Sequence, residues 1–175
     1  MEKEELVKHS NLLLMYVLIY IALASCASVV DHKYFDNTLG LNVKVQKKSF
    51  DSSDAINSQG EGFSIQTYTF EDNGKEGLFI DKITYPKTYE ERKGWKILQW
   101  QNTPLKNEDV LGLLFKYDIK DVEMKDQLTK IEEALKSTDN YFSYYYKDYH
   151  GEIYSVDICI VDVKNKKIYL REIIT

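Results

Sequence analysis

The segment "YFSYYYKDYHGEIYSVDICIVDVKNKKIYLREII" (residues 141–174) decides the fold. It contains three runs that are rich in aromatic and β-branched residues, at 141–149, 152–163 and 168–174. Short polar sequences, His150-Gly151 and "KNKK", separate these runs. Consecutive runs with such tight breaks predict strands joined by hairpins, and therefore an antiparallel sheet.

Four upstream runs extend the predicted sheet. "LNVKVQKKSF" (41–50) alternates apolar and polar residues, which is the period of a half-buried strand. "FSIQTYTF" (63–70) and "LFIDKITY" (78–85) flank the turn sequence "EDNGKEG", so these three runs predict an antiparallel meander. "WKILQWQ" (95–101) is predicted to form a further short strand.

After residue 102 the apolar spacing becomes helical. Thr103 is predicted to cap a short helix that has Pro104 at its first position. A second helix is predicted from about Asp121, and its outer side is expected to pair Glu132 with Lys136. The inner side of that helix consists of Met124, Leu128, Ile131 and Leu135.

Together these elements predict an α+β domain over residues 39–175. We expect a mostly antiparallel sheet of about six to seven strands, with two helices packed on one of its faces. The length of this part of the chain suits one domain with its own core.

The N-terminal region has the pattern of an export signal. Every residue from Leu12 to Ala24 is apolar or tyrosine, a run shorter than the roughly 20 residues that cross a bilayer. It ends in Leu23, Ala24, Ser25 and Cys26, which resembles the bacterial lipobox, where the cysteine receives a diacylglyceryl group before cleavage. The sequence therefore predicts a cleaved signal peptide over 1–25, a Cys26 that carries acyl chains such as palmitate, and a tether over 26–38.

Two alternatives to the lipoprotein signal stay open. One is an ordinary signal peptide cut near Ala24 or Ala27, and the other is an uncleaved anchor helix that extends to Val30. The segment before the apolar run contains three glutamates, whereas a leader normally has a positive excess there. All three interpretations predict an extracytoplasmic domain, and acylation of Cys26 with more than one chain predicts stable attachment to the membrane.

Charge and cysteine content restrict the partners. The chain has a formal net charge of −5 and no basic stripe, which disfavours nucleic acid as a partner. Its two arginines, Arg92 and Arg171, are the only side chains that could grip a phosphate or carboxylate in bidentate fashion, which argues against a dedicated phosphate site. Cys159 lies in the apolar run "SVDICIVDV" and is predicted to be a buried strand cysteine.

Few residues suggest catalysis or metal binding. His32 and His150 are predicted to be exposed loop residues, and the chain has no serine elbow and no Cys-His signature. An oxygen-rich loop could hold calcium, but its spacing departs from that of an EF-hand, so a solvated loop is preferred; its residues are Asp51, Asp54, Asn57 and Glu61. We assign no catalytic residue, no metal and no cofactor from the sequence.

The excess of tyrosine is the strongest signal of an interaction surface. Strand alternation over 141–149 sends Phe142, Tyr144 and Tyr146 to one face and Tyr141, Tyr145 and Tyr149 to the other. One set is expected in the core. The other set, with the neighbouring His150, is predicted to form a surface for a protein or glycan partner, because amphipathic tyrosines are common at such surfaces.

The chain also resembles a family of small bacterial proteins, many of them lipoproteins, that has no assigned activity. The resemblance rests on "GEGFSIQTYTF" (60–70), "GWKILQWQNTPL" (94–105) and "YFSYYYKDYHGEIYSVDICIVDVKNKKIYL" (141–170). Gly60-Glu61-Gly62 replaces the Gly-Asp-Gly turn that is typical of the family, and the histidines that often precede that turn are absent. The resemblance implies the same fold and anchor and no particular activity.

Two functions remain open at this level. The first is a membrane-anchored binding module, such as an accessory envelope protein or an immunity-type lipoprotein that neutralises an incoming toxin. The second is an envelope enzyme that acts on wall or polysaccharide substrates. The enzyme requires a concave pocket that holds at least two convergent carboxylates, or a histidine near His150.

Overall fold

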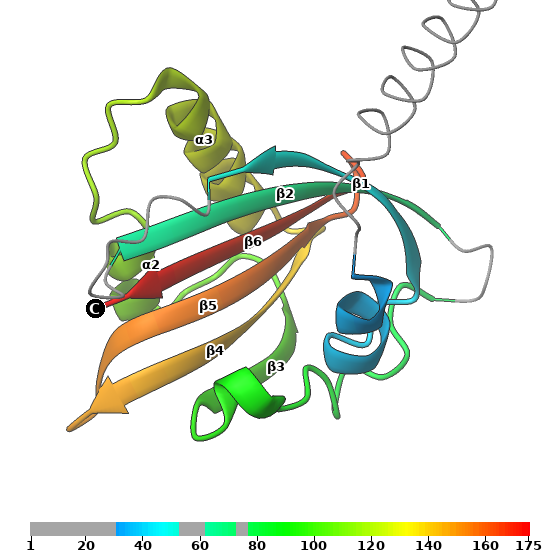
Figure 1. Ribbon diagram of the computed structural model, residues 1–175, viewed down its shortest axis with the longest axis horizontal. Coiled ribbons are helices and arrows are strands. Elements are labelled where there is room, and N and C mark those ends of the chain that lie inside the picture. The colour runs from blue at the N-terminus through cyan, green and yellow to red at the C-terminus, as the bar shows by residue number, and fades with distance from the viewer. Residues whose placement is uncertain (1–30, 53–61, 73–76) are drawn as a thin grey trace, which may run out of the picture.

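The computed structural model describes residues 31–52, 62–72 and 77–175, and it contains one six-stranded antiparallel sheet (Figure 1). The strand order across the sheet is β1-β2-β6-β5-β4-β3. The strands are β1 (Val43–Asp51), β2 (Gly62–Asp72), β3 (Lys96–Asn102), β4 (Tyr141–Tyr149), β5 (Glu152–Asp162) and β6 (Lys167–Ile174). The helical elements are η1 (Tyr34–Thr38), η3 (Glu90–Arg92), α2 (Glu108–Leu114) and α3 (Val122–Lys136).

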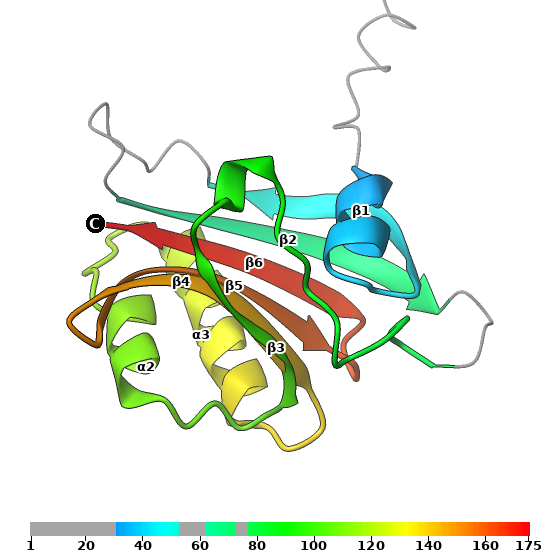
Figure 2. The ribbon, with the colours of Figure 1, turned by 90° about the horizontal axis from the view of Figure 1, so that it is seen from below.

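The predicted α+β fold is confirmed, and each face of the sheet has its own layer of cover. Figure 2 shows α2 and α3 on one face and the segments that contain η1 and η3 on the other. The first face, the helix face, packs Val110 and Leu114 of α2 and Ile131 of α3 against Ile65 and Ile158. The second face, here called the open face, buries Phe35 of η1 with Trp100, Val161 and Ile168.

The C-terminal strands form as predicted. β4 and β5 are joined by a tight turn in which His150 and Gly151 both have positive φ (51° and 92°), the conformation that a two-residue hairpin favours. Strand alternation also distributes the aromatic side chains as expected. Phe142, Tyr144 and Tyr146 pack in the helix-face core, and Tyr141 and Tyr145 pack in the open-face core.

The strand predicted at 78–85 is wrong. That segment makes turns and contributes only an isolated bridge between Leu41 and Phe79. The reason is local: the Asp81 carboxylate accepts hydrogen bonds from the Ile83 N–H at 2.8 Å and the Thr84 hydroxyl at 3.0 Å. These bonds replace a strand ladder with an aspartate-stabilised turn.

The predicted start of the first helix is also wrong. α2 begins at Glu108, and the Asn107 side chain caps it by accepting a hydrogen bond from the Val110 N–H. Thr103 is buried instead, and both its N–H and its hydroxyl donate to the Asn140 carbonyl. The threonine therefore ties β3 to the start of β4 and caps no helix.

The second helix matches its prediction. Asp121 caps α3, since its carboxylate accepts from the Met124 N–H at 2.8 Å. Lys136 and Glu132 form the expected ion pair at 2.6 Å on the outer side. Ile131 and Leu135 are buried against the sheet.

Candidate functional site

Some of the predicted site residues lie outside the described part of the chain. The lipobox residues Leu23, Ala24, Ser25 and Cys26 belong to this group, and so does the stretch of the oxygen-rich loop that carries Asp54, Asn57 and Glu61. Within the described ranges, no helix has the length and apolar character needed to cross a membrane.

The tyrosines predicted as one interaction surface do not lie together. Tyr145 is only 2% exposed, and its hydroxyl donates to the Lys87 carbonyl at 2.5 Å. Tyr141 packs edge-on against Phe79 at the opposite end of β4 from the hairpin turn. Tyr149, which is 71% exposed, packs against the His150 ring at the tip of the β4–β5 hairpin. Only the hairpin tip therefore remains as an exposed part of that predicted surface.

A row of polar side chains crosses the otherwise apolar open face. The register of the sheet places Ser64 of β2 beside Glu172 of β6, Glu172 beside Asp157 of β5, and Asp157 beside Tyr145 of β4. Cross-strand neighbours of this kind share one face of the sheet. The row brings together groups from four strands that are far apart in the sequence.

Arg92 of η3 covers this polar row. Its Nε and Nη2 donate to one Asp157 carboxylate oxygen at 3.2 and 2.9 Å, and Nη2 also donates to Glu172. The guanidinium carbon lies 4.5 Å from the centre of the Trp95 ring. One arginine thus binds two carboxylates and fixes η3 against the sheet.

Beside Arg92 lies a recess of about 280 Å³ between the sheet, η1 and η3. We call it the Arg92 recess. It is lined by Asp31, Tyr34, Phe35, Ser64, Gln66, Tyr68, Tyr89, Arg92, Asp157, Leu170 and Glu172. Four aromatic residues and three carboxylates are among these lining residues.

The electrostatics of the Arg92 recess depend on burial. Asp157 is only 8% exposed, and loss of hydration raises the pKa of its carboxyl to about 6, aided by Glu172 and opposed by Arg92. Burial opposes the charge on Arg92, but Asp157 and Glu172 outweigh it and raise the pKa of the guanidinium. Burial also raises the pKa of Tyr34 well above its usual value and the pKa of Tyr89 to about 12, and the nearby Asp157 carboxylate is the second cause of both increases.

Two further groups border the polar row. Cys159 is buried, as predicted, and burial and Asp157 raise the pKa of its thiol, so it stays protonated and unreactive. The hydroxyl of Ser64 belongs to a residue that is only 9% exposed, and no other described residue forms a hydrogen bond with it. A hydroxyl that lines a recess and has no protein partner can bind a ligand group.

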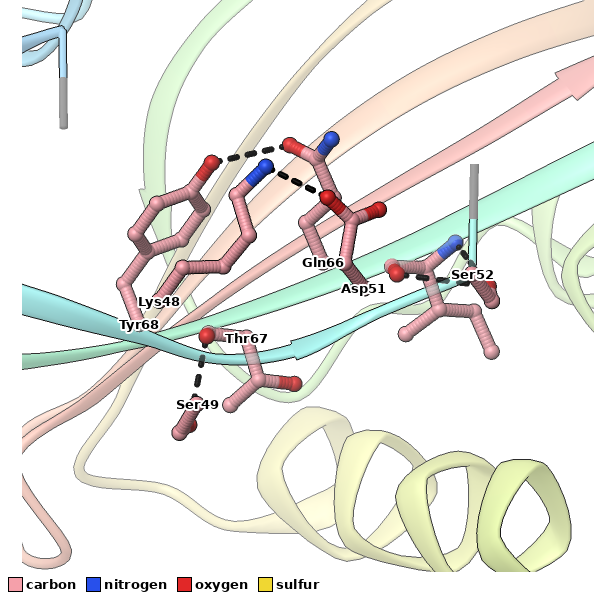
Figure 3. A network of polar contacts seen from close by, with 8 residues as sticks. Lys48, Ser49, Asp51, Ser52, Gln66, Thr67 and Tyr68 are labelled. Carbon is pink, nitrogen blue, oxygen red and sulfur yellow. Dashed lines mark hydrogen bonds and ion pairs between the residues drawn. The ribbon is translucent and has the colours of Figure 1, made fainter. Parts of the chain in front are cut away.

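Figure 3 shows how β1 and β2 contribute to both faces. Tyr68 donates from its hydroxyl to Gln66 at 2.9 Å on the side of the Arg92 recess, while Lys48 pairs with Asp51 at 2.5 Å nearby. Ser49 and Thr67 lie on the other side, and Thr67 bonds Gln127 of α3 at 2.9 Å. These two residues line a second, larger groove of about 620 Å³ on the helix face.

The helix-face groove is the weaker candidate. Asp162 is buried there, and both of its carboxylate oxygens already accept hydrogen bonds from Asn165. The other charged residues of the groove carry both signs and are exposed or half-buried; they are Lys130, Glu133, Asp139, Lys164 and Lys167. Such exposed charges are well hydrated and weakly coupled to one another. The Arg92 recess combines buried charge, aromatic walls and an unpartnered hydroxyl, so it is the better site.

The sequence contained a partial signal for this site. Asp157 stands inside the apolar run "SVDICIVDV", where a carboxylate needs a partner. Arg92 was identified as one of only two side chains that could bind a phosphate or carboxylate in bidentate fashion. Their pairing with Glu172 was missed because these residues meet only through the register of β5 and β6 and the position of η3.

Comparisons with models of protein families, with curated proteins and with solved structures found no match for the chain. In the described ranges, no group of three or more histidine, cysteine, aspartate and glutamate side chains is arranged to hold a metal ion. The resemblance to small bacterial lipoproteins stays a prediction, and the chemistry of the Arg92 recess is the main guide to function.

Proposed function

We propose that the chain is a bacterial lipoprotein, held on the outer side of a membrane by acyl chains on Cys26, and that it acts as a binding module. The Arg92 recess is its binding site. The observation that carries the proposal is a recess whose lining combines two carboxylates, Asp157 and Glu172, with a Ser64 hydroxyl that forms no hydrogen bond with another described residue. Accessory envelope proteins and immunity-type lipoproteins that neutralise a toxin are of this class.

The position of the recess relative to the proposed anchor supports this function. Asp31, which lines the recess, follows Cys26 by five residues in the sequence. A fully extended chain spans at most roughly 3.5 Å per residue, so this edge of the recess lies within about 20 Å of the acylated cysteine. A partner at or near the membrane surface is therefore within reach.

The anchor is tested by mass spectrometry of the membrane fraction, with wild type compared against Cys26→Ala. We expect a mature wild-type chain that begins at an acylated Cys26, and a variant that is released or accumulates uncleaved. An unacylated chain cut elsewhere would overturn the lipoprotein part of the proposal.

The binding site is tested by capture of partners from envelope extracts. The full chain in detergent should retain a partner that is lost with Glu172→Gln. Glu152→Gln is the matched control, because Glu152 is an exposed glutamate at the start of β5, away from the recess. Equal capture by all three proteins would overturn the assignment of the recess.

The same two carboxylates favour a second candidate, an envelope enzyme that acts on wall or polysaccharide substrates. The raised pKa of Asp157 is a property of general acids in glycoside hydrolysis. Binding is preferred because Arg92 occupies one oxygen of each carboxylate. Hydrolysis of a wall polymer by wild type, and its loss in Glu172→Gln, would establish the enzyme instead.

A further inference from the structure

We infer that the Arg92 recess receives an alkylammonium group, supplied by a lysine side chain of a protein partner or by a small free amine. This inference rests on the proposed function and adds the chemical class of the ligand. It follows from the charge, the walls and the size of the recess.

The charge of the recess is negative. Asp31, Asp157 and Glu172 face one cation, Arg92, among the lining residues. Lys48 lies outside this set, with its ammonium 2.5 Å from an Asp51 carboxylate oxygen and 5.7 Å from the centre of the Tyr68 ring. A second cation inside the recess would balance the excess of carboxylates, whereas an anion would be repelled by them.

The walls favour a cation that also carries apolar surface. Tyr34 meets Phe35 and Tyr89 edge-on, with ring centres 5.7 Å apart in both pairs, and Phe35 meets Tyr68 at 5.0 Å. Aromatic faces are electron-rich and attract ammonium groups, while the rings also cover a methylene chain.

The size of the recess selects a small group. At about 280 Å³ it lies just below the range of roughly 300 to 1,000 Å³ that is usual for sites of drug-sized ligands. A single alkylammonium side chain suits this volume. The hydroxyl of Ser64 and the carboxylate oxygens that Arg92 leaves free can accept its N–H groups.

The first test measures binding of small probes to the full chain in detergent micelles by ligand-observed NMR. The probes are N-acetyl-lysine methylamide, free n-butylammonium, the neutral N-acetyl-norleucine methylamide and N-acetylglucosamine. We expect both cations to bind, and the neutral isostere and the sugar to bind at least about tenfold more weakly. A lysine derivative that binds more tightly than the free amine identifies a protein partner, and the reverse order identifies a small amine.

The second test uses variants and pH. Glu172→Gln should weaken cation binding by about tenfold, and Glu152→Gln should leave it unchanged. Binding should also weaken as the pH falls below about 6, because Asp157 is then protonated. The groups that face Asp157 are Arg92, Glu172, Tyr34, Tyr89, Tyr145 and Cys159. The pKa values of the arginine, the three tyrosines and the cysteine are all raised, so the charges of these five groups stay constant from pH 5 to 8.

The outcomes separate this inference from the proposed function. Binding of the sugar in preference to both cations would overturn the ammonium inference and leave a binding module. The same holds if the envelope partner is lost with Glu172→Gln while no cation binds. If no probe binds and the variant captures the same partners as wild type, both proposals fail.

Discussion

The two arginines of this chain occupy contrasting sites on the two faces of one sheet. Arg92 covers the open face and binds Asp157 and Glu172. Arg171 of β6 lies on the helix face, is 0% exposed, and forms no hydrogen bond with any other described residue. Its guanidinium carbon lies 5.2 Å from the centre of the Phe63 ring, and its cross-strand neighbours are Ile65 and Ile158.

The contrast arises from the geometry of a strand. Arg171 is followed directly by Glu172, yet successive side chains of a strand point to opposite faces. Glu172 therefore turns to Arg92, whose position in the sequence is 80 residues away, and Arg171 is left among apolar groups. Loss of hydration lowers the pKa of Arg171 to about 10, so it is still charged at neutral pH and its charge lowers the stability of the fold.

The largest effect is expected from Arg92→Met. This change leaves Asp157 and Glu172 side by side without their cation, and breaking a buried ion pair costs about 3 to 5 kcal/mol. We expect a loss of about 3 kcal/mol in the free energy of unfolding at pH 7, measured by urea denaturation, since the groups keep some contact with water.

Lys93→Met is the matched control for Arg92→Met. It removes the same charge from the adjacent, exposed position. Its effect should stay within about 0.5 kcal/mol. Equal losses in the two variants would show that the Arg92 bridge contributes no more to stability than an exposed charge.

The sequence predicted the elements of the fold better than the contacts between them. The three C-terminal strands and α3 were predicted from the regular spacing of their apolar residues. That spacing reflects only which side of each element is buried, so it can be read from a short run of sequence. The segment 78–85 has the composition of a strand, but Asp81 satisfies nearby backbone and hydroxyl groups and leaves Ile80 and Ile83 exposed. A local turn prevailed there over β propensity.

The site was less accessible to prediction because it is non-local. Tyr145 was expected at a surface, but strand alternation fixes only its face, and the segment that carries Lys87 and η3 covers that face. The partners Arg92 and Asp157 are 65 residues apart. Only the full register of the sheet brings such groups together.

The next effect concerns pH and Asp157. The folded protein keeps the Asp157 proton up to about pH 6, whereas the ordinary pKa of the group is 3.8. The folded state therefore binds more protons in this window, and the contribution of Asp157 to stability falls as the pH rises from about 4 to 6, by about 2 to 3 kcal/mol. The free energy of unfolding of wild type minus that of Asp157→Asn should fall by this amount across the window.

Arg92→Met sharpens this pH prediction. Arg92 holds the pKa of Asp157 down, so its removal should move the window to higher pH. A difference between wild type and Asp157→Asn that does not vary from pH 4 to 7 would contradict the account of the open-face site.

The smallest effect has the opposite sign and comes from Arg171→Met. Methionine is flexible and apolar and can follow the path of the arginine side chain among Phe63, Ile65 and Ile158. The change removes a buried charge that no described residue compensates, and it loses a cation–π contact worth about 0.5 to 2 kcal/mol. We expect a net gain of about 1 kcal/mol in the free energy of unfolding, measured by urea denaturation at pH 7. A loss of several kcal/mol would show instead that ordered water or an ion binds the guanidinium, since a satisfied buried charge is costly to remove and an unsatisfied one is not.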